Sequence, residues 1–142
     1  MKIVVDTSVF VSATLSAGGA SRQVIRLCLE GVVIPLMSGA LFHEFEDVMG
    51  RAELFANCRI PVSERNELLD AFLSVCAWTP IWFLWRPNLR DEDDNFLVEL
   101  AVSGVAAAIV TSNKKDFRGA DLKFGGFAVL DPAEFLSWRK SK

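Results

Sequence analysis

The apolar residues of this chain gather in five short runs, separated by longer stretches of mixed polarity. The runs cover residues 3–5, 32–37, 79–85, 107–111 and 127–130. Most of them lack the alternation of apolar and polar positions that marks a half-exposed strand. Such runs are typical of strands buried on both faces, as in a parallel sheet covered by helices. We therefore predict five strands.

The stretches between these runs carry the spacing and the end signals of helices. Ser38 precedes an apolar stripe at helical spacing that continues to about Met49, as expected of an N-cap. Asp131, followed by proline and by an acid three residues on, marks another helix start. The remaining predicted helices run from Ser21 to a stop at Gly31, from about residues 61–63 to 76, and over residues 96–102.

Strands that alternate with helices along a chain predict a parallel sheet with helices packed on its faces. The expected fold is a three-layer α/β/α sandwich of the α/β class with a central parallel sheet. At 142 residues the chain is long enough to bury a core, and no repeat, linker or low-complexity segment interrupts it. We expect one domain over residues 1–142.

The hydrophobic fraction is 51% and the mean hydropathy is +0.31, both high for a soluble domain. Such a surplus favours self-association or a partner protein. No apolar run reaches the roughly 18 residues needed to span a bilayer, and Asp6 interrupts the first run early. We expect a cytoplasmic protein without a membrane partner.

Cysteine, histidine and net charge exclude several kinds of site. Cys28, Cys58 and Cys76 are widely spaced and the chain has a single histidine, His43, so neither a disulfide framework nor a zinc site is expected. The net charge of −3 argues against binding nucleic acid through overall charge. A local basic surface beside an acidic pocket remains compatible with that balance.

Polar residues follow two of the predicted strands, and acids lie on two of the predicted helices. Asp6 comes directly after the first strand, and Asn113 ends the polar triplet after the fourth. Glu44 lies at the border of the apolar stripe that begins after Ser38. Asp94 belongs to a run of acids that opens the helix before the fourth strand. Each has a simpler interpretation, because Asp6 could cap a turn, Glu44 could be solvated, and acids at a helix N-terminus are stabilised by its dipole.

If the first strand is central, these residues can surround one cleft at the carboxyl ends of the strands, where α/β sheets bind ligands. Carboxylates held within a few ångströms repel one another unless a cation neutralises them. A site built from oxygen ligands, without cysteine or histidine, suits Mg²⁺ or Mn²⁺. Such an ion can promote hydrolysis of a phosphodiester.

These residues resemble a known family, the PIN-domain ribonucleases, and especially the VapC-like toxins of type II toxin–antitoxin pairs. The resemblance covers nearly the whole chain, and its short motifs gain specificity from their order and spacing. They are the sequence Val-Asp-Thr-Ser at residues 5–8, Glu44, the segment 91–101, the segment 109–117 and the segment 129–136.

The resemblance implies a PIN-like fold and a metal-dependent endoribonuclease that acts on RNA. Asp6, Glu44 and Asp94 match the three core metal-binding acids of the family. Asn113 stands where many members have a fourth aspartate, and Asp116 is then the residue implied as the fourth carboxylate. The implied cofactor is Mg²⁺ or Mn²⁺, and the implied partners are a small antitoxin and a second copy in a homodimer.

Two other functions remain open from the sequence. A PIN fold with a diluted set of acids could bind RNA or a protein partner without cleavage. The other function is that of a phosphatase-like or receiver-like α/β domain, in which Asp6 would accept a phosphoryl group. Haloacid-type phosphatases have a DxDxT motif, and Ser8 stands where that motif has its second aspartate. The nuclease is therefore the preferred hypothesis.

Overall fold

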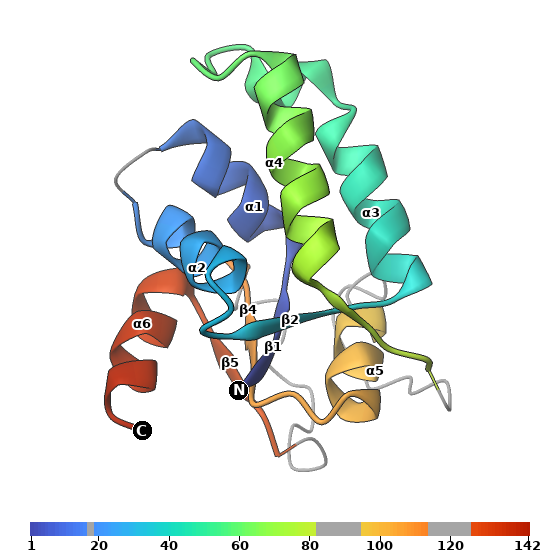
Figure 1. The fold of residues 1–142 in the computed structure, drawn as a ribbon, viewed down its shortest axis with the longest axis vertical. Helices are drawn as coiled ribbons and strands as arrows, with labels where there is room; N and C mark the ends of the chain where they lie inside the picture. The colour runs from blue at the N-terminus through green and yellow to red at the C-terminus, as the bar shows by residue number, and fades with distance from the viewer. Residues whose placement is uncertain (17–18, 82–94, 114–125) are drawn as a thin grey trace.

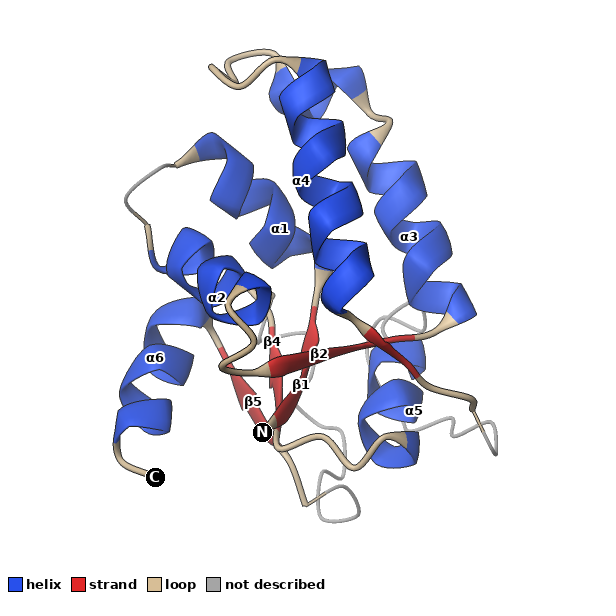
Figure 2. Cartoon of the chain, viewed as in Figure 1, coloured by secondary structure: helices blue, strands red, loops and turns tan. Residues whose placement is uncertain are grey.

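The computed structural model describes residues 1–16, 19–81, 95–113 and 126–142, and in these ranges it contains a five-stranded parallel sheet. The strand order is β3-β2-β1-β4-β5, so the first strand lies in the middle, and Figure 2 shows the strands surrounded by helices. The strands are β1 (Lys2–Val5), β2 (Ile34–Met37), β3 (Ala77–Trp78), β4 (Ala108–Val110) and β5 (Ala128–Leu130).

Helices connect the strands and cover the sheet (Figure 1). Helix α1 packs against both α2 and α3, and α2 packs against α6, whereas α5 packs directly on β1, β2 and β4. None of the described helices is long and apolar enough to cross a membrane. The helical elements are α1 (Thr7–Leu15), α2 (Ala20–Leu29), α3 (Gly39–Met49), the 3-10 turn η1 (Ala52–Phe55), α4 (Val62–Val75), α5 (Asn95–Ser103) and α6 (Pro132–Lys140). This arrangement confirms the predicted α/β class and parallel central sheet.

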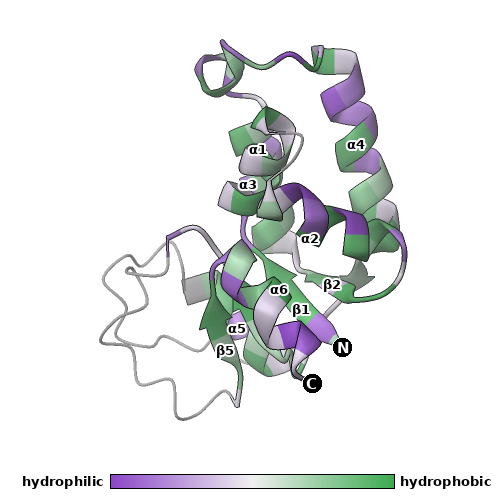
Figure 3. Cartoon of the chain, turned by 90° about the vertical axis from the view of Figure 1, so that its left-hand side faces the viewer, coloured by the Kyte–Doolittle hydropathy of each residue, from purple (hydrophilic) through white to green (hydrophobic). Residues whose placement is uncertain are grey.

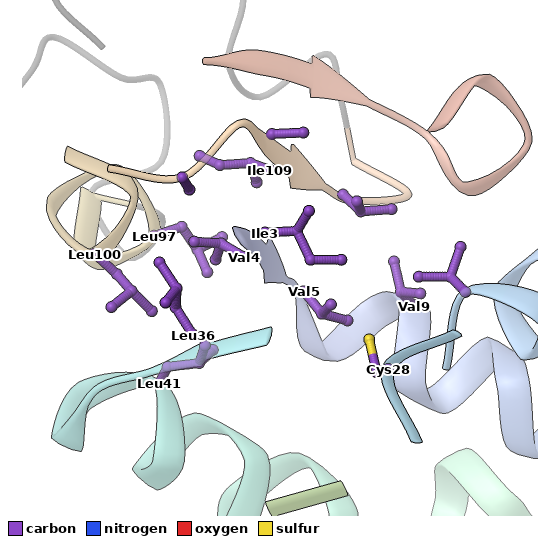
Figure 4. Packing of buried hydrophobic residues seen from close by; sticks show 14 of the residues in the cluster. Ile3, Val4, Val5, Val9, Cys28, Leu36, Leu41, Leu97, Leu100 and Ile109 are labelled. Carbon is purple, nitrogen blue, oxygen red and sulfur yellow. The ribbon is translucent and has the colours of Figure 1, made fainter. Parts of the chain in front are cut away.

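The core forms on both faces of β1 because its side chains are apolar on both. Val4 lies beside Leu97 of α5, whereas Val5 lies on the side of Val9 of α1 and Cys28 of α2 (Figure 4). All five of these side chains are almost fully buried. Burial of each large aliphatic side chain stabilises the fold by about 1.5–3 kcal/mol. In Figure 3 the strands are mostly hydrophobic, whereas α2 and α4 carry hydrophilic residues over part of their surface.

The helix starts predicted at Ser38 and Asp131 are confirmed. Ser38 Oγ accepts a hydrogen bond from the N–H of Leu41 at 3.2 Å. Asp131 and Glu134 form a reciprocal capping box, with bonds of 2.8 and 2.9 Å. Each such cap stabilises a helix by about 1 kcal/mol, so short polar signals place these two boundaries well.

The predicted third strand is wrong in position. The aromatic run at 79–85 suggested it, but β3 is Ala77–Trp78, because Met37 pairs with Trp78 and the N–H of Thr79 bonds Met37 O at 2.8 Å. Pro80, which has no N–H to donate, follows directly. Residues 82–85 of the predicted strand lie outside the described residues.

Helix α5 ends in a turn that places a β-branched residue in an unusual conformation. The N–H of Ala106 bonds Ala101 O at 2.9 Å, and the N–H of Val105 bonds Val102 O at 3.3 Å. Val105 has a φ of 54° and is 78% exposed. Glycine is strongly favoured at this position of a helix end, so the backbone of Val105 is strained, at a position on the protein surface.

Candidate active site

Asp6 lies at the carboxyl end of the central strand, where the sequence predicts it. It is only 6% exposed, and its N–H donates to Val110 O at 3.0 Å. Its backbone is extended and it precedes the first residue of α1, but its carboxylate makes no capping hydrogen bond to that helix. The simpler interpretation of Asp6 as a helix cap is therefore wrong, and the buried carboxylate needs another explanation.

Hydroxyl groups hold the Asp6 carboxylate in place. Thr111 Oγ1 donates to Asp6 Oδ2 at 2.7 Å, and Ser8 Oγ donates to the same oxygen at 3.0 Å. A hydrogen bond to a charged group contributes about 1.5–3 kcal/mol. The other oxygen, Oδ1, has only a long 3.4 Å contact from Thr7 Oγ1. One carboxylate oxygen is thus fixed by the protein, and the other keeps more of its capacity to accept a ligand.

The register of the sheet explains why residues so far apart in sequence meet here. Val5 pairs with Val110, so the residues that follow the two strands leave the sheet side by side. The hydroxyls of Ser8 and Thr111 also bind the backbone of the loop that follows β4. Ser8 Oγ accepts from the N–H of Ser112 at 3.1 Å, and Thr111 Oγ1 accepts from the N–H of Asn113 at 3.0 Å.

A cleft of about 530 Å³ opens at this end of the sheet, between α1 and α3. Glu44, half-buried on α3, lies on its wall, and the exposed residue Asn113 lies at the end of β4. Asp6 is just behind the surface, because Thr7 and Ser8 line the cleft and Asp6 does not. The lining residues are Thr7, Ser8, Val11, Ser12, Leu15, Glu44, Val48, Arg51, Leu54, Ser112 and Asn113.

The structure thus brings Asp6, Glu44 and Asn113 to one end of the sheet. Asp94 and Asp116, the other two acids named from the sequence, lie outside the described residues. Two residues of this region had no role assigned from sequence, namely Thr111, which holds Asp6, and Arg51, which lines the cleft. Thr111 was seen only as part of a polar triplet, and Arg51 was overlooked, although it follows Glu44 by two helical turns.

The donor chemistry of this region fits a hard divalent cation. The carboxylates of Asp6 and Glu44, the amide oxygen of Asn113 and the hydroxyls of Ser8 and Thr111 are all oxygen donors, as Mg²⁺ and Mn²⁺ prefer. In the part of the chain that the structure describes, no three acids, histidines or cysteines come close enough to hold a metal ion by themselves. Asp6 and Glu44 supply the two described acids of the region.

Cys28 and Cys76 contribute no soft ligand or nucleophile at neutral pH. Burial raises the pKa of the Cys28 thiol to about 12, with a smaller contribution from Cys76 nearby. Burial also raises the pKa of the Cys76 thiol to about 12. Both thiols therefore stay protonated, and thiolate is the form that binds metals and attacks electrophiles.

Comparisons with known proteins agree with this architecture. The sequence model of the PIN domain matches residues 2–115. The uncharacterized protein MJ1680 of Methanocaldococcus jannaschii is 27% identical over 119 residues, which are 80% of this chain and 72% of that protein. The crystal structure of VapBC2 from Rickettsia felis, bound to a DNA fragment from its promoter, has a chain of similar fold. The TM-score is 0.60 at 16% identity, over 91% of this chain and 97% of the other.

Proposed function

The chain belongs to the PIN-domain family, a family of nucleases, and from that premise we propose that it is a metal-dependent endoribonuclease. One observation carries the proposal. The carboxylate of Asp6 is buried at the carboxyl end of the central strand, serves no helix as a cap, and is held by two hydroxyls beside the cleft that Glu44 lines. Burying a charged group is unfavourable, and a buried carboxylate at the mouth of a cleft favours a use in chemistry beyond these hydrogen bonds.

Asp6, Glu44 and Asp94 would hold Mg²⁺ or Mn²⁺, with Asp116 and Asn113 completing the set of ligands. Asp94 enters this set through the run of acids that opens a predicted helix and through the sequence resemblance, and Asp116 enters it through the resemblance alone. When bound, the ion supplies Lewis-acid stabilisation of the negative charge that develops on the phosphate oxygens. Asn113 would contribute an amide oxygen without charge.

The described residues prepare the site for this reaction. Thr111 and Ser8 donate to one oxygen of Asp6, so the carboxylate keeps one orientation and loses little entropy when a ligand binds. Both hydroxyls also accept backbone N–H groups of residues 112 and 113, which fixes the start of the exit loop against α1. The protein thus fixes the orientation of the Asp6 carboxylate at the edge of the open cleft.

We further propose that the protein is the toxin of a toxin–antitoxin pair, bound by a small antitoxin protein, and that it forms a homodimer in the cytoplasm. The similar fold of a chain in the VapBC2 structure from Rickettsia felis supports the toxin role. Exposed apolar side chains support a protein partner. Trp78 is 56% exposed and contacts the ring of Phe42 at 5.6 Å, and Val62 is 58% exposed.

The test is cleavage of single-stranded RNA by the purified protein with Mg²⁺ or Mn²⁺ and with EDTA. We expect cleavage that requires the metal and falls by about 100-fold or more in Asp6→Asn and in Glu44→Gln. Glu46→Gln is the matched control, because Glu46 is an exposed acid of the same helix that does not line the cleft. Equal cleavage by wild type and Asp6→Asn, with or without metal, contradicts the proposal.

One observation favours a second candidate, a PIN module that binds RNA without cleaving it. At the end of β4 the cleft presents the amide of Asn113 rather than a carboxylate, which lowers the negative charge available for a metal. Wild-type protein that binds RNA but leaves it intact with both metals would favour this module over the nuclease.

A further inference from the structure

The cleft has a charge problem that a nuclease must solve. It lies beside Asp6 and Glu44, and the chain as a whole carries a net charge of −3, yet an RNA strand brings one negative charge per nucleotide. Without compensation, acids and phosphates repel one another. A cationic side chain next to the acids is the usual answer, and arginine suits phosphate best because its fork of donors matches the phosphate oxygens.

Arg51 is the one basic residue among the described residues that line the cleft. It follows α3 directly after the capping residue Gly50, and it opens the 3-10 turn η1. Its N–H donates to Val48 O at 3.1 Å, and its carbonyl accepts the N–H of Leu54 at 3.1 Å, so the backbone at this position is fixed.

Arg51 and Glu44 both line the cleft. Seven positions separate the two residues, which is about two turns and about 10 Å along a helix axis. Stacked nucleotides advance by about 3.4 Å along a strand, so this separation corresponds to about three nucleotides. Arg51 is therefore within reach of a phosphate about three nucleotides from the one near Glu44.

Asp47 forms a salt bridge with the guanidinium of Arg51. Arg51 Nη2 donates to Asp47 in a salt bridge one turn back along the chain. Nearby Asp47, and more weakly Glu44, raise the pKa of Arg51, which keeps it charged. Within the described part of the chain, Nε and Nη1 of Arg51 have no protein acceptor, so donors remain for a ligand.

The salt bridge between Arg51 and Asp47 contributes too little to the stability of the fold to explain its presence. Both side chains are about half exposed or more, and exposed ion pairs contribute little to stability. A cation after the last turn of α3 also interacts weakly and favourably with the helix dipole. A purely structural role therefore predicts small effects on stability and none on RNA.

We propose that Arg51 binds a phosphate of the RNA backbone about three nucleotides from the cleavage position. The inference rests on the proposed function, and it adds a substrate-binding residue on the α3 side of the cleft. Because a phosphate contact carries no base information, Arg51 strengthens RNA binding equally for all sequences.

The experiment measures fluorescence anisotropy of a labelled single-stranded RNA in EDTA, at several salt concentrations, with the RNA shown to be intact on a gel. Arg51→Ala should weaken binding by about tenfold and reduce the slope of log affinity against log salt by about 0.7. Arg51→Lys keeps a charge without the fork, so it should weaken binding by about threefold.

Two variants serve as matched controls. Asp47→Ala breaks the salt bridge but keeps the cation, and Arg26→Ala removes an exposed arginine of α2 that does not line this cleft. Both should bind RNA within about twofold of wild type. The proposal is overturned if Arg51→Ala binds within that range, if either control weakens binding as much, or if wild type does not bind RNA. No RNA is cleaved in this binding assay. The nuclease proposal is therefore tested separately, by comparing RNA cleavage by wild type and Asp6→Asn in the presence of metal.

Discussion

Thr111 offers the sharpest test of how the site is built, because one atom, Oγ1, joins both strands and the loop. The side chain is fully buried, and Oγ1 donates to Asp6 Oδ2 at 2.7 Å while accepting the N–H of Asn113 at 3.0 Å. Thr111→Val keeps the shape of the side chain and leaves no cavity, so its effect isolates the hydroxyl.

The expected loss of stability follows from the bonds that disappear. A hydrogen bond to a carboxylate contributes about 1.5–3 kcal/mol, and Ser8 Oγ still donates to the same oxygen, so the cost is about 2 kcal/mol. The N–H of Asn113 adds little, because that residue is exposed and water can replace the lost acceptor. For a chain of this size about 2 kcal/mol lowers Tm by about 8 °C.

Thermal and urea unfolding of wild type, Thr111→Val and Thr111→Ser measure this effect. The serine variant keeps the hydroxyl, so it should lose clearly less stability than the valine variant. In an Asp6→Asn background the hydroxyl meets an uncharged acceptor, and the cost of Thr111→Val should fall by about 1 kcal/mol. A valine variant as stable as wild type, or an equal cost in both backgrounds, would refute the hydrogen bond as the link between the strands.

Three further predictions concern the fold. Val105→Gly should raise Tm by about 3 °C, since relief of the strained φ of 54° outweighs the added chain entropy, whereas a lower Tm would contradict the strain. Gly104→Ala should lower the free energy of unfolding in urea by about 1–3 kcal/mol, because the new Cβ would lie 2.4 Å from Leu36 Cδ1. An unchanged urea midpoint would contradict this, since it would mean that Leu36 can move aside without cost. With their pKa raised to about 12, the thiols of Cys28 and Cys76 are almost fully protonated at about pH 8, so thiol reagents should modify them only in denaturant. They should gain reactivity as the pH rises toward 12. Because Cys58 is also a free thiol, the labelled positions are located by peptide mapping, and rapid labelling of Cys28 or Cys76 in the folded protein would contradict the prediction.

The fold was predictable from sequence where local chemistry decides the structure. Uninterrupted apolar strands and polar caps, such as those at Ser38 and Asp131, indicated a parallel sheet and located two helix starts. The helix α1 was not predicted, because its small and apolar residues are buried on several sides and leave no polar face to reveal the period. The third strand was misplaced because its position depends on pairing with β2, which the aromatic run at 79–85 does not encode.

The candidate site was predictable in its acids but not in the groups that hold them. A carboxylate directly after a buried strand pointed to Asp6, and the border of an apolar stripe pointed to Glu44. The contact between Asp6 and Thr111 depends on the register of β1 against β4, a long-range property that no local pattern contains. Arg51 lies just past the end of α3, and it could have been found by extending the helical spacing from Glu44 by two turns.

The most direct test of the proposed metal-dependent chemistry is calorimetric titration of Mn²⁺ into the wild-type protein and the Asp6→Asn variant, both first shown to be folded. Asparagine keeps the size of the side chain and an oxygen for Thr111, so it removes charge with little change in shape. We expect saturable binding to wild type at or below about 1 mM metal, and loss of that binding in Asp6→Asn. No binding to wild type, or equal binding to both proteins, would contradict Asp6 as the anchor of a metal site.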